Sequence, residues 1–231
     1  MEPMELPPLL RRAVDLVLEG VAPADLSAAA ESLLARYRAE LRDERFHLAD
    51  DLAVSAYLAM RLPATYAAIR ASLKAACENR PGFTLRSLLD VGAGAGAALW
   101  AAVDRWPGLE AALLLEGSPV MRAWDGRLSA AAGVGRLRWR AADIATALPD
   151  AEPHDLVTLA YVLDELAPEK RGPLLDGLWR LTADLLVIVE PGTPAGWQRI
   201  LAARARLLAA GAFVVAPCPH GAACPLHPPD W

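Results

Sequence analysis

Three acids and a run of glycines are spaced as in a site for an adenosine-containing cofactor. Asp90 ends an apolar run two residues before Gly92, and Glu116 and Asp143 follow the next two apolar runs. Glycines lack a Cβ atom, so a ligand can approach the backbone closely. The helix expected after the glycines offers free N–H groups at its N-terminus. The predicted cofactor-binding residues are Asp90, Gly92, Ala93, Gly94, Gly96, Glu116, Asp143 and Tyr161.

Two cofactors compete for this glycine loop. NAD needs glycines that admit a pyrophosphate and an acid on the following strand for its ribose. S-adenosylmethionine (SAM) has no pyrophosphate, and its site needs acids near the methionine amino group, the ribose and the adenine amine. The spacing of Asp90, Glu116 and Asp143 favours SAM and resembles the class I methyltransferases. An NAD-dependent oxidoreductase and a fold that keeps the loop but binds nothing are the alternatives.

A second pair of acids follows the fourth apolar run, in the segment Tyr161–Leu166. Transfer of a methyl group from a sulfonium needs in-line alignment and a dry site more than strong acid–base help. Asp164 and Glu165 are therefore the predicted catalytic residues, which would orient or deprotonate an acceptor. The alternative is that both are first-turn acids of the next helix, where the helix dipole favours them.

Two cysteines and two histidines lie within ten positions near the end of the chain: Cys218, His220, Cys224 and His227. A tetrahedral zinc site of this donor set is chemically possible. An iron–sulfur cluster usually takes four thiolates, and the third cysteine, Cys77, is far away in the sequence. The predicted metal ligands are Cys218 and Cys224, and the alternative is two unrelated thiols in a surface turn.

The composition limits the possible partners. The 231 residues carry a net charge of −5, whereas a protein that holds nucleic acid by charge alone is expected to be basic. Contacts with RNA would thus be local, and Arg199, Arg204 and Arg206 form one candidate basic face. No apolar stretch reaches the length of a membrane span and no signal peptide is visible, so we expect a cytoplasmic protein without a membrane partner.

The elements that must position these residues follow a clear order. Residues 1–82 are predicted to be a helical cap, with helices near 9–18, 25–43, 50–61 and 65–78. From Leu85 onward, strands alternate with helices, which predicts an α/β domain with a doubly wound, mostly parallel sheet over residues 83–231. The predicted strands are 85–91, 111–115, 137–141, 156–161, 185–189 and 213–216.

The chain resembles the mitochondrial small-ribosomal-subunit-associated methyltransferase-like proteins and their bacterial relatives. Two blocks carry most of this resemblance, Glu190-Pro191-Gly192-Thr193-Pro194 and Pro217-Cys218-Pro219-His220. Supporting blocks lie at 56–66, 90–94 and 161–166, and the resemblance spans roughly Tyr37 to Trp231.

The resemblance implies a seven-stranded-type, Rossmann-like methyltransferase fold and SAM as cofactor. It implies a role at the small ribosomal subunit, through either rRNA methylation or subunit assembly, the latter without catalysis as the alternative. It further implies a 4Fe-4S cluster in the loop 216–227, with Cys218 and Cys224 as its first two ligands. In the family a third cysteine follows an Asp-Trp pair, and this chain ends at Asp230-Trp231. This ending predicts either that the chain is truncated or that this member has lost the cluster.

Overall fold

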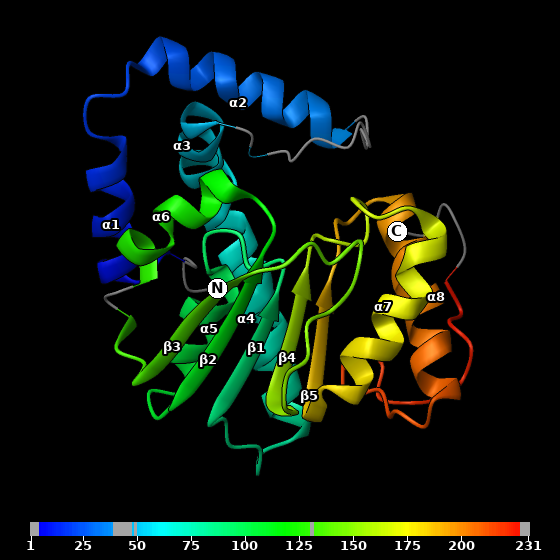
Figure 1. Cartoon of the computed structure of the whole chain (residues 1–231). Coiled ribbons are helices and arrows are strands. Elements are labelled where there is room, and N and C mark those ends of the chain that lie inside the picture. Colours follow the sequence, from blue (N-terminus) through cyan, green and yellow to red (C-terminus); the bar gives the residue numbers. More distant parts are fainter. Residues whose placement is uncertain (1–4, 39–47, 49, 130–131, 227–231) are drawn as a thin grey trace.

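A computed structural model describes residues 5–38, 48, 50–129 and 132–226 (Figure 1). The helices are α1 (Pro8–Leu18), α2 (Pro23–Arg38), α3 (Asp51–Met60), α4 (Leu62–Asn79), α5 (Ala97–Arg105), α6 (Pro119–Ser129), α7 (Pro168–Arg180) and α8 (Pro194–Ala209). The strands are β1 (Ser87–Val91), β2 (Ala111–Glu116), β3 (Arg136–Ala141), β4 (His154–Ala160) and β5 (Thr182–Val189). The four N-terminal helices agree with the sequence prediction, although the predicted end of the second, beyond Arg38, lies outside the described residues.

The strands form one sheet in the order β3-β2-β1-β4-β5, and every pair is parallel. The strand order reverses between β1 and β4, which is where doubly wound sheets bind their ligands. The predicted α/β fold class is therefore confirmed.

The sixth predicted strand is wrong. Residues 213–216 form no strand and pair with none in the described part of the chain, and Phe213 is 90% exposed. An apolar run of this kind has the composition of a strand, but a strand also needs a neighbour that accepts its hydrogen bonds. The described residues thus form a five-stranded sheet, and the seven-strand count expected from the resemblance is not observed in them.

Two hydrophobic cores lie on opposite faces of the sheet because side chains alternate along a strand. Leu88 and Leu156 pack into the core formed with α4, α5 and α6, whereas Leu89 and Val157 pack into the core formed with α7 and α8. Figure 1 shows α7 and α8 to the right of β5, and α4 and α5 behind the sheet.

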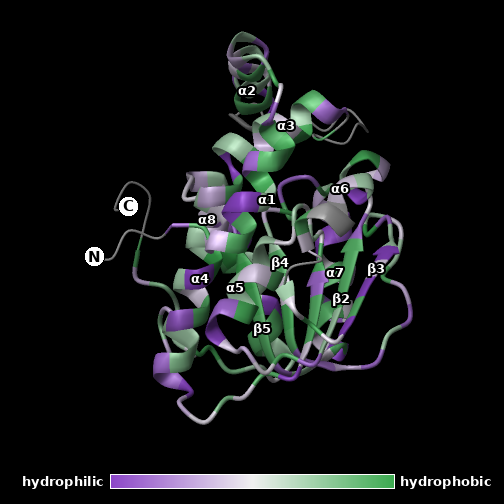
Figure 2. Ribbon diagram, turned by 90° about the vertical axis from the view of Figure 1, so that its left-hand side faces the viewer, coloured by the Kyte–Doolittle hydropathy of each residue, from purple (hydrophilic) through white to green (hydrophobic). Residues whose placement is uncertain are grey.

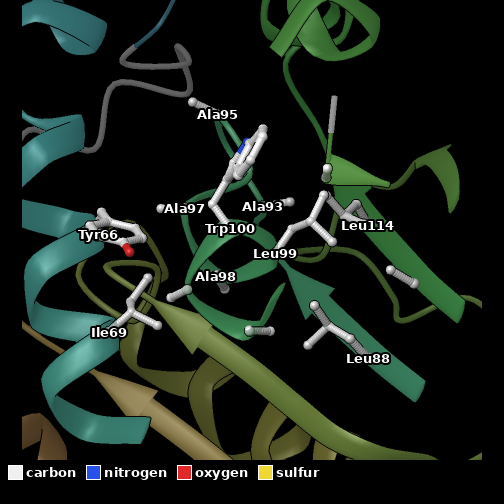
Figure 3. Packing of buried hydrophobic residues seen from close by; sticks show 14 of the residues in the cluster. Tyr66, Ile69, Leu88, Ala93, Ala95, Ala97, Ala98, Leu99, Trp100 and Leu114 are labelled. Atoms are coloured by element: carbon white, nitrogen blue, oxygen red, sulfur yellow. The ribbon is translucent and has the colours of Figure 1, made fainter. Parts of the chain in front are cut away.

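The alanine-rich helix α5 fixes the position of the loop before it. Ala97, Ala98, Ala101 and Ala102 are almost fully buried, and their small side chains allow α4 to pack closely. Figure 3 shows Trp100 of α5 among these residues, and its indole N–H donates to the Leu128 carbonyl of α6 at 3.0 Å.

The N-terminal helices share a core with the sheet. Buried residues of α1, α3 and α4 belong to the same cluster as residues of β1 and α5, and Figure 1 places α2 and α3 above the ends of the strands. The boundary between residues 1–82 and 83–231 stays a prediction. Among the described helices, none alone is long and apolar enough to span a membrane; α3 and α4 meet the length and composition test only as a pair bent by 52°.

Candidate functional site

The glycine loop joins β1 to α5 at the carboxyl edge of the sheet. Gly92, Gly94 and Gly96 all have positive φ, at 71°, 52° and 74°, which glycine adopts without steric cost. A Cβ atom on Gly92 would lie 2.4 Å from Cγ2 of Val162, so this position excludes every other residue. The loop therefore lies directly against the segment that follows β4.

Glu116 fastens this loop from the tip of β2. Its two carboxylate oxygens accept hydrogen bonds from the backbone N–H groups of Gly94 at 2.8 Å and Ser118 at 2.7 Å. Burial raises the pKa of Glu116, and the two N–H donors oppose that shift. Each carboxylate oxygen has a second acceptor site, so Glu116 retains the capacity to bind hydroxyl groups of a ligand.

Asp90 is the most unusual acid of the site. It is the next-to-last residue of β1, it is 2% exposed, and its Oδ1 accepts a hydrogen bond from the Thr158 hydroxyl at 2.7 Å. Its Oδ2 is buried and has no hydrogen-bond partner. Burial raises the pKa of Asp90 to about 7, the Thr158 hydroxyl lowers it, and the negative charge of Glu116 raises it further. A buried acceptor without a donor is rare in proteins, and a cationic ligand would supply one.

A tyrosine from the N-terminal helices covers the loop. Tyr57 of α3 lines a cavity of about 20 Å³ together with Thr65, Asp90, Gly92 and Ala160. A Cβ atom built on Gly94 would lie 3.7 Å from the Tyr57 hydroxyl, and burial raises the pKa of that hydroxyl to about 12. This volume holds about one water molecule, so the cavity is closed to a nucleoside in this conformation.

Of the other predicted cofactor residues, Ala93 lines the same cavity, whereas Asp143 and Tyr161 differ in their surroundings. Asp143 follows β3 but is exposed, and its carboxylate accepts hydrogen bonds from Ala145 N–H at 3.1 Å and the Thr146 hydroxyl at 2.9 Å. It thus closes its own turn. Tyr161 follows β4 with a φ of 59°, an uncommon conformation for a non-glycine residue. Burial raises the pKa of Tyr161, and the nearby charge of Arg61 opposes the shift.

Asp164 and Glu165 lie in the turn between β4 and α7. Because α7 begins at Pro168, the alternative that they are first-turn acids of that helix is wrong, and Glu169 has that position. Asp164 is buried, whereas Glu165 is exposed. The pKa of Glu165 is raised to about 8, first by desolvation and then by the charges of nearby carboxylates. Because Glu165 is exposed to solvent, the negative charges of the nearby carboxylates are the main cause of its raised pKa.

A buried ion pair that sequence reasoning missed supports this turn. Glu190 directly follows β5, and its Oε2 accepts from Nε of Arg199 of α8 at 2.5 Å, with the two side chains 1% and 4% exposed. Its Oε1 accepts from the Leu163 N–H at 3.2 Å, and Arg171 donates to the Leu163 carbonyl at 2.8 Å. Burial raises the pKa of Glu190 and Arg199 opposes the shift. Glu190 and Arg171 therefore hold both sides of the residue before Asp164.

The remaining residues of the Glu-Pro-Gly-Thr-Pro block explain why α8 begins where it does. Thr193 is the N-cap, its hydroxyl accepts from the Gly196 N–H at 3.1 Å, and Pro194 follows in the first turn. A Cβ atom on Gly196 would lie 2.1 Å from the carbonyl oxygen of Pro191. The block therefore sets the position of α8, which carries Arg199.

One residue of the candidate basic face of α8 lies in the interior, so the three arginines do not form one exposed face. Arg199 is buried against Glu190, Arg204 donates to the carbonyls of His220 and Ala222, and Arg206 pairs with Asp176 at 2.6 Å. The helical spacing of these arginines does not reveal which groups pack against them.

The cysteine loop does not form a metal site within the described residues. Cys218 is exposed and Cys224 is partly buried, while His227 lies outside the residues that the structure describes. No group of three or more His, Cys, Asp or Glu side chains in the described part of the chain is placed to hold an ion. These donors do not fit zinc or a four-thiolate cluster, and the assignment of Cys218 and Cys224 as ligands stays a prediction.

The strand order, the glycine loop after β1 and the acids that end β1 and β2 are those of the class I methyltransferase fold. Residues 51–231 match the family model for the mitochondrial small ribosomal subunit protein Rsm22, and the chain belongs to this family. The resemblance seen in the sequence is thereby confirmed.

The chain is also similar to individual proteins of known sequence or structure. The chain is 29% identical over 243 residues to the human mitochondrial ribosome assembly protein METTL17, covering 96% of this chain and 53% of that protein, so it spans about half the length of this curated relative. The N,N-8-amino-8-demethyl-D-riboflavin dimethyltransferase RosA from Streptomyces davawensis is similar in structure, with 20% identity, a TM-score of 0.48 and coverage of 79% of this chain and 56% of that chain. A SAM-dependent methyltransferase from Clostridium acetobutylicum has 15% identity, a TM-score of 0.44 and coverage of 53% and 49%.

Proposed function

We propose that this chain binds SAM at the carboxyl edge of its sheet and acts at the small ribosomal subunit. The observation that carries the proposal is the buried Oδ2 of Asp90, which has no hydrogen-bond donor and lines the cavity beside the glycine loop. An ammonium group such as that of methionine would supply a donor and a positive charge at this point. NAD would instead need room for a pyrophosphate at the same loop, and its phosphates would place negative charge beside Asp90.

Each residue has a distinct task in this proposal. Asp90 binds the amino group of the methionine part, Glu116 accepts from the ribose hydroxyls, and Asp143 lies on the adenine side. Bound SAM supplies an activated methyl group. Asp164 and Glu165 orient the acceptor, and the raised pKa of Glu165 allows it to hold or accept a proton near neutral pH.

Tyr57 makes cofactor binding dependent on the N-terminal helices. Tyr57 of α3 lines the cavity of about 20 Å³, and its hydroxyl lies 3.7 Å from where a Cβ atom on Gly94 would be. In this proposal SAM enters when the Tyr57 side chain moves away from Gly94. Binding therefore selects an open conformation, and its apparent affinity is reduced by the fraction of molecules that are closed.

The ribosomal part of the proposal follows from family membership. The family model is described as a protein of the mitochondrial small ribosomal subunit, and the human relative is named as a ribosome assembly protein. We propose a cytoplasmic site of action and a contact with the subunit or its rRNA, for this chain or for a longer protein that contains it.

A second candidate is an assembly factor that does not transfer methyl groups. The closed cavity favours it, because a site covered by Tyr57 suits a protein that uses the cofactor, if bound, for stability rather than turnover. Both candidates use the same SAM site, and they differ in whether a methyl group is transferred to an acceptor.

Calorimetry and a methyl-transfer assay separate these possibilities. Titration of the chain with SAM should give binding that Asp90→Asn removes, while Asp143→Asn, an exposed acid in its own turn, changes it less. Tritiated SAM with isolated small ribosomal subunits should then release label into RNA or protein if the chain is an enzyme. Co-sedimentation without label transfer would favour the assembly factor. Binding of NADH in place of SAM would contradict the proposal.

A further inference from the structure

The outer edge strand of the sheet presents a row of arginines. β3 reads Arg136-Leu137-Arg138-Trp139-Arg140, and side chains alternate between the two faces of a strand. Leu137 and Trp139 pack against the core on the α6 side, where the Trp139 indole N–H donates to the Ser129 hydroxyl at 3.1 Å. The three arginines therefore share the opposite face, and all three residues are exposed.

No described helix covers this face of β3. The crossover from β3 to β4, residues 142–153, contains no helix, although a crossover between parallel strands usually does. The buried core on that side takes residues from β1, β2 and β4 together with α7 and α8, and none from β3. Figure 1 shows the front of β3 open, and Figure 2 shows hydrophilic residues recurring along it.

The arginines of β3 keep their positive charge uncompensated by an ion pair, in contrast to Arg70, Arg80 and Arg206. Arg140 donates to the neutral carbonyl of Asp150 at 3.0 Å, and among the described residues no carboxylate forms an ion pair with Arg136, Arg138 or Arg140. Elsewhere, Arg70 pairs with Asp104 and Arg80 with Asp184, both at 2.8 Å. A local row of three such charges is notable in a chain whose net charge is −5.

We propose that Arg136, Arg138 and Arg140 bind the phosphate backbone of RNA. Alternate residues of a strand lie about 6.6 Å apart, so the row presents evenly spaced guanidinium groups along a line. Guanidinium groups bind phosphate oxygens with two parallel hydrogen bonds, and such contacts position a protein on RNA without reading its sequence. This inference rests on the proposed ribosomal function for the identity of the RNA, which would be that of the small subunit.

Two other roles of the arginine row must be distinguished from RNA binding by experiment. Charged side chains on an edge strand prevent other strands from pairing with it and so oppose aggregation. An acidic protein segment would also match the charge. In either case, substitution of the three arginines would leave the binding of RNA unchanged.

The test is the salt dependence of RNA binding. The variant R136Q/R138Q/R140Q and the matched control R12Q/R86Q/R105Q each lose three charges from exposed arginines. Binding of a labelled single-stranded RNA is measured between about 50 and 200 mM salt. Loss of three phosphate contacts should reduce the slope of log affinity against log salt by about 2 in the first variant, and the control should change it little. An equal slope in the two variants, or aggregation with unchanged RNA binding, would overturn the proposal.

Two further measurements keep this inference apart from the proposed function. SAM binding, followed by calorimetry, should be the same in both triple variants because β3 contributes no residue to the cavity. If the wild-type chain binds the RNA through β3 but does not sediment with small ribosomal subunits, the ribosomal function is wrong and the surface stands. If it sediments with subunits and both variants do so equally at every salt concentration, the surface is wrong and the function stands.

Discussion

Two buried carboxylates lie at the carboxyl ends of two strands of the same sheet, and their surroundings are opposite. Glu190 at the end of β5 accepts hydrogen bonds at both oxygens, one of them from the guanidinium of Arg199. Asp90, near the end of β1, lines the cavity and accepts a hydrogen bond at one oxygen, and its other oxygen is buried without a hydrogen-bond partner. Both oxygens of Glu190, which supports a turn, thus have hydrogen-bond donors within the protein. One oxygen of Asp90, which we assign to a ligand, has none.

This difference distinguishes a structural acid from a binding acid in the absence of any ligand. The ionised form of Glu190 is stabilised by a fixed partner, so its removal should mainly affect folding. The ionised form of Asp90 lacks such a partner, so its removal should mainly affect binding and should relieve a cost to folding. The following predictions test the two halves of this comparison.

The largest effect is expected from Glu190→Gln. This change leaves the Arg199 guanidinium buried without its counter-charge, which typically costs about 3–5 kcal/mol of unfolding free energy. Urea unfolding measures it. The control is Asp176→Asn, which breaks the Arg206 pair whose side chains are 50% and 46% exposed, and which should cost no more than about 1 kcal/mol. Equal losses in the two variants would remove the distinction between the pairs.

The variant Asp90→Asn should be more stable than the wild type at pH 8. Because the folded-state pKa of Asp90 is about 7 and the ordinary value is 3.8, the native state binds more protons than the unfolded state between these values, so stability falls as pH rises across that window. We expect a gain of about 1–3 kcal/mol at pH 8, since the new amide lacks one partner, and little gain near pH 4. Thermal unfolding at both pH values measures it, and destabilisation at pH 8 would contradict the assignment.

The affinity of the wild type for SAM should fall as the pH is lowered. A cationic amino group binds the ionised form of Asp90, so protonation below about pH 7 competes with binding and should reduce the affinity by about tenfold per pH unit between pH 7 and 5. Calorimetric titrations at three pH values measure this slope. If the affinity did not change with pH, another group would have to bind the amino end of the cofactor.

The smallest effect is expected from Tyr57→Ala. Removal of the ring enlarges the cavity beside Gly94, so the closed conformation no longer excludes the cofactor, and the affinity for SAM should rise by a few-fold. Tyr57→Phe is the matched control, because it keeps the ring and loses only the hydroxyl. Weaker binding in a folded Tyr57→Ala variant would mean that the ring contacts the cofactor instead of covering its site.

The sequence was sufficient for features set by local pattern. Short apolar runs bounded by breakers located five strands, and the glycines after Asp90 located the turn. The same pattern failed at Phe213, because a strand depends on a distant partner. It also failed at Arg199, because helical spacing places arginines on one side without revealing that Glu190 packs there. The Tyr57 contact was missed because α3 is far from Gly94 in sequence, although residues 56–66 form one of the blocks of the family resemblance.

The absence of a side chain at Gly196 has a consequence beyond its own position. Any substituent there would collide with the carbonyl of Pro191 and push the start of α8 outward. Arg199 lies one turn further along the same helix, so the displacement would carry its guanidinium away from Glu190 and let water between them. The lack of a side chain at Gly196 thus preserves the buried ion pair between Arg199 and Glu190.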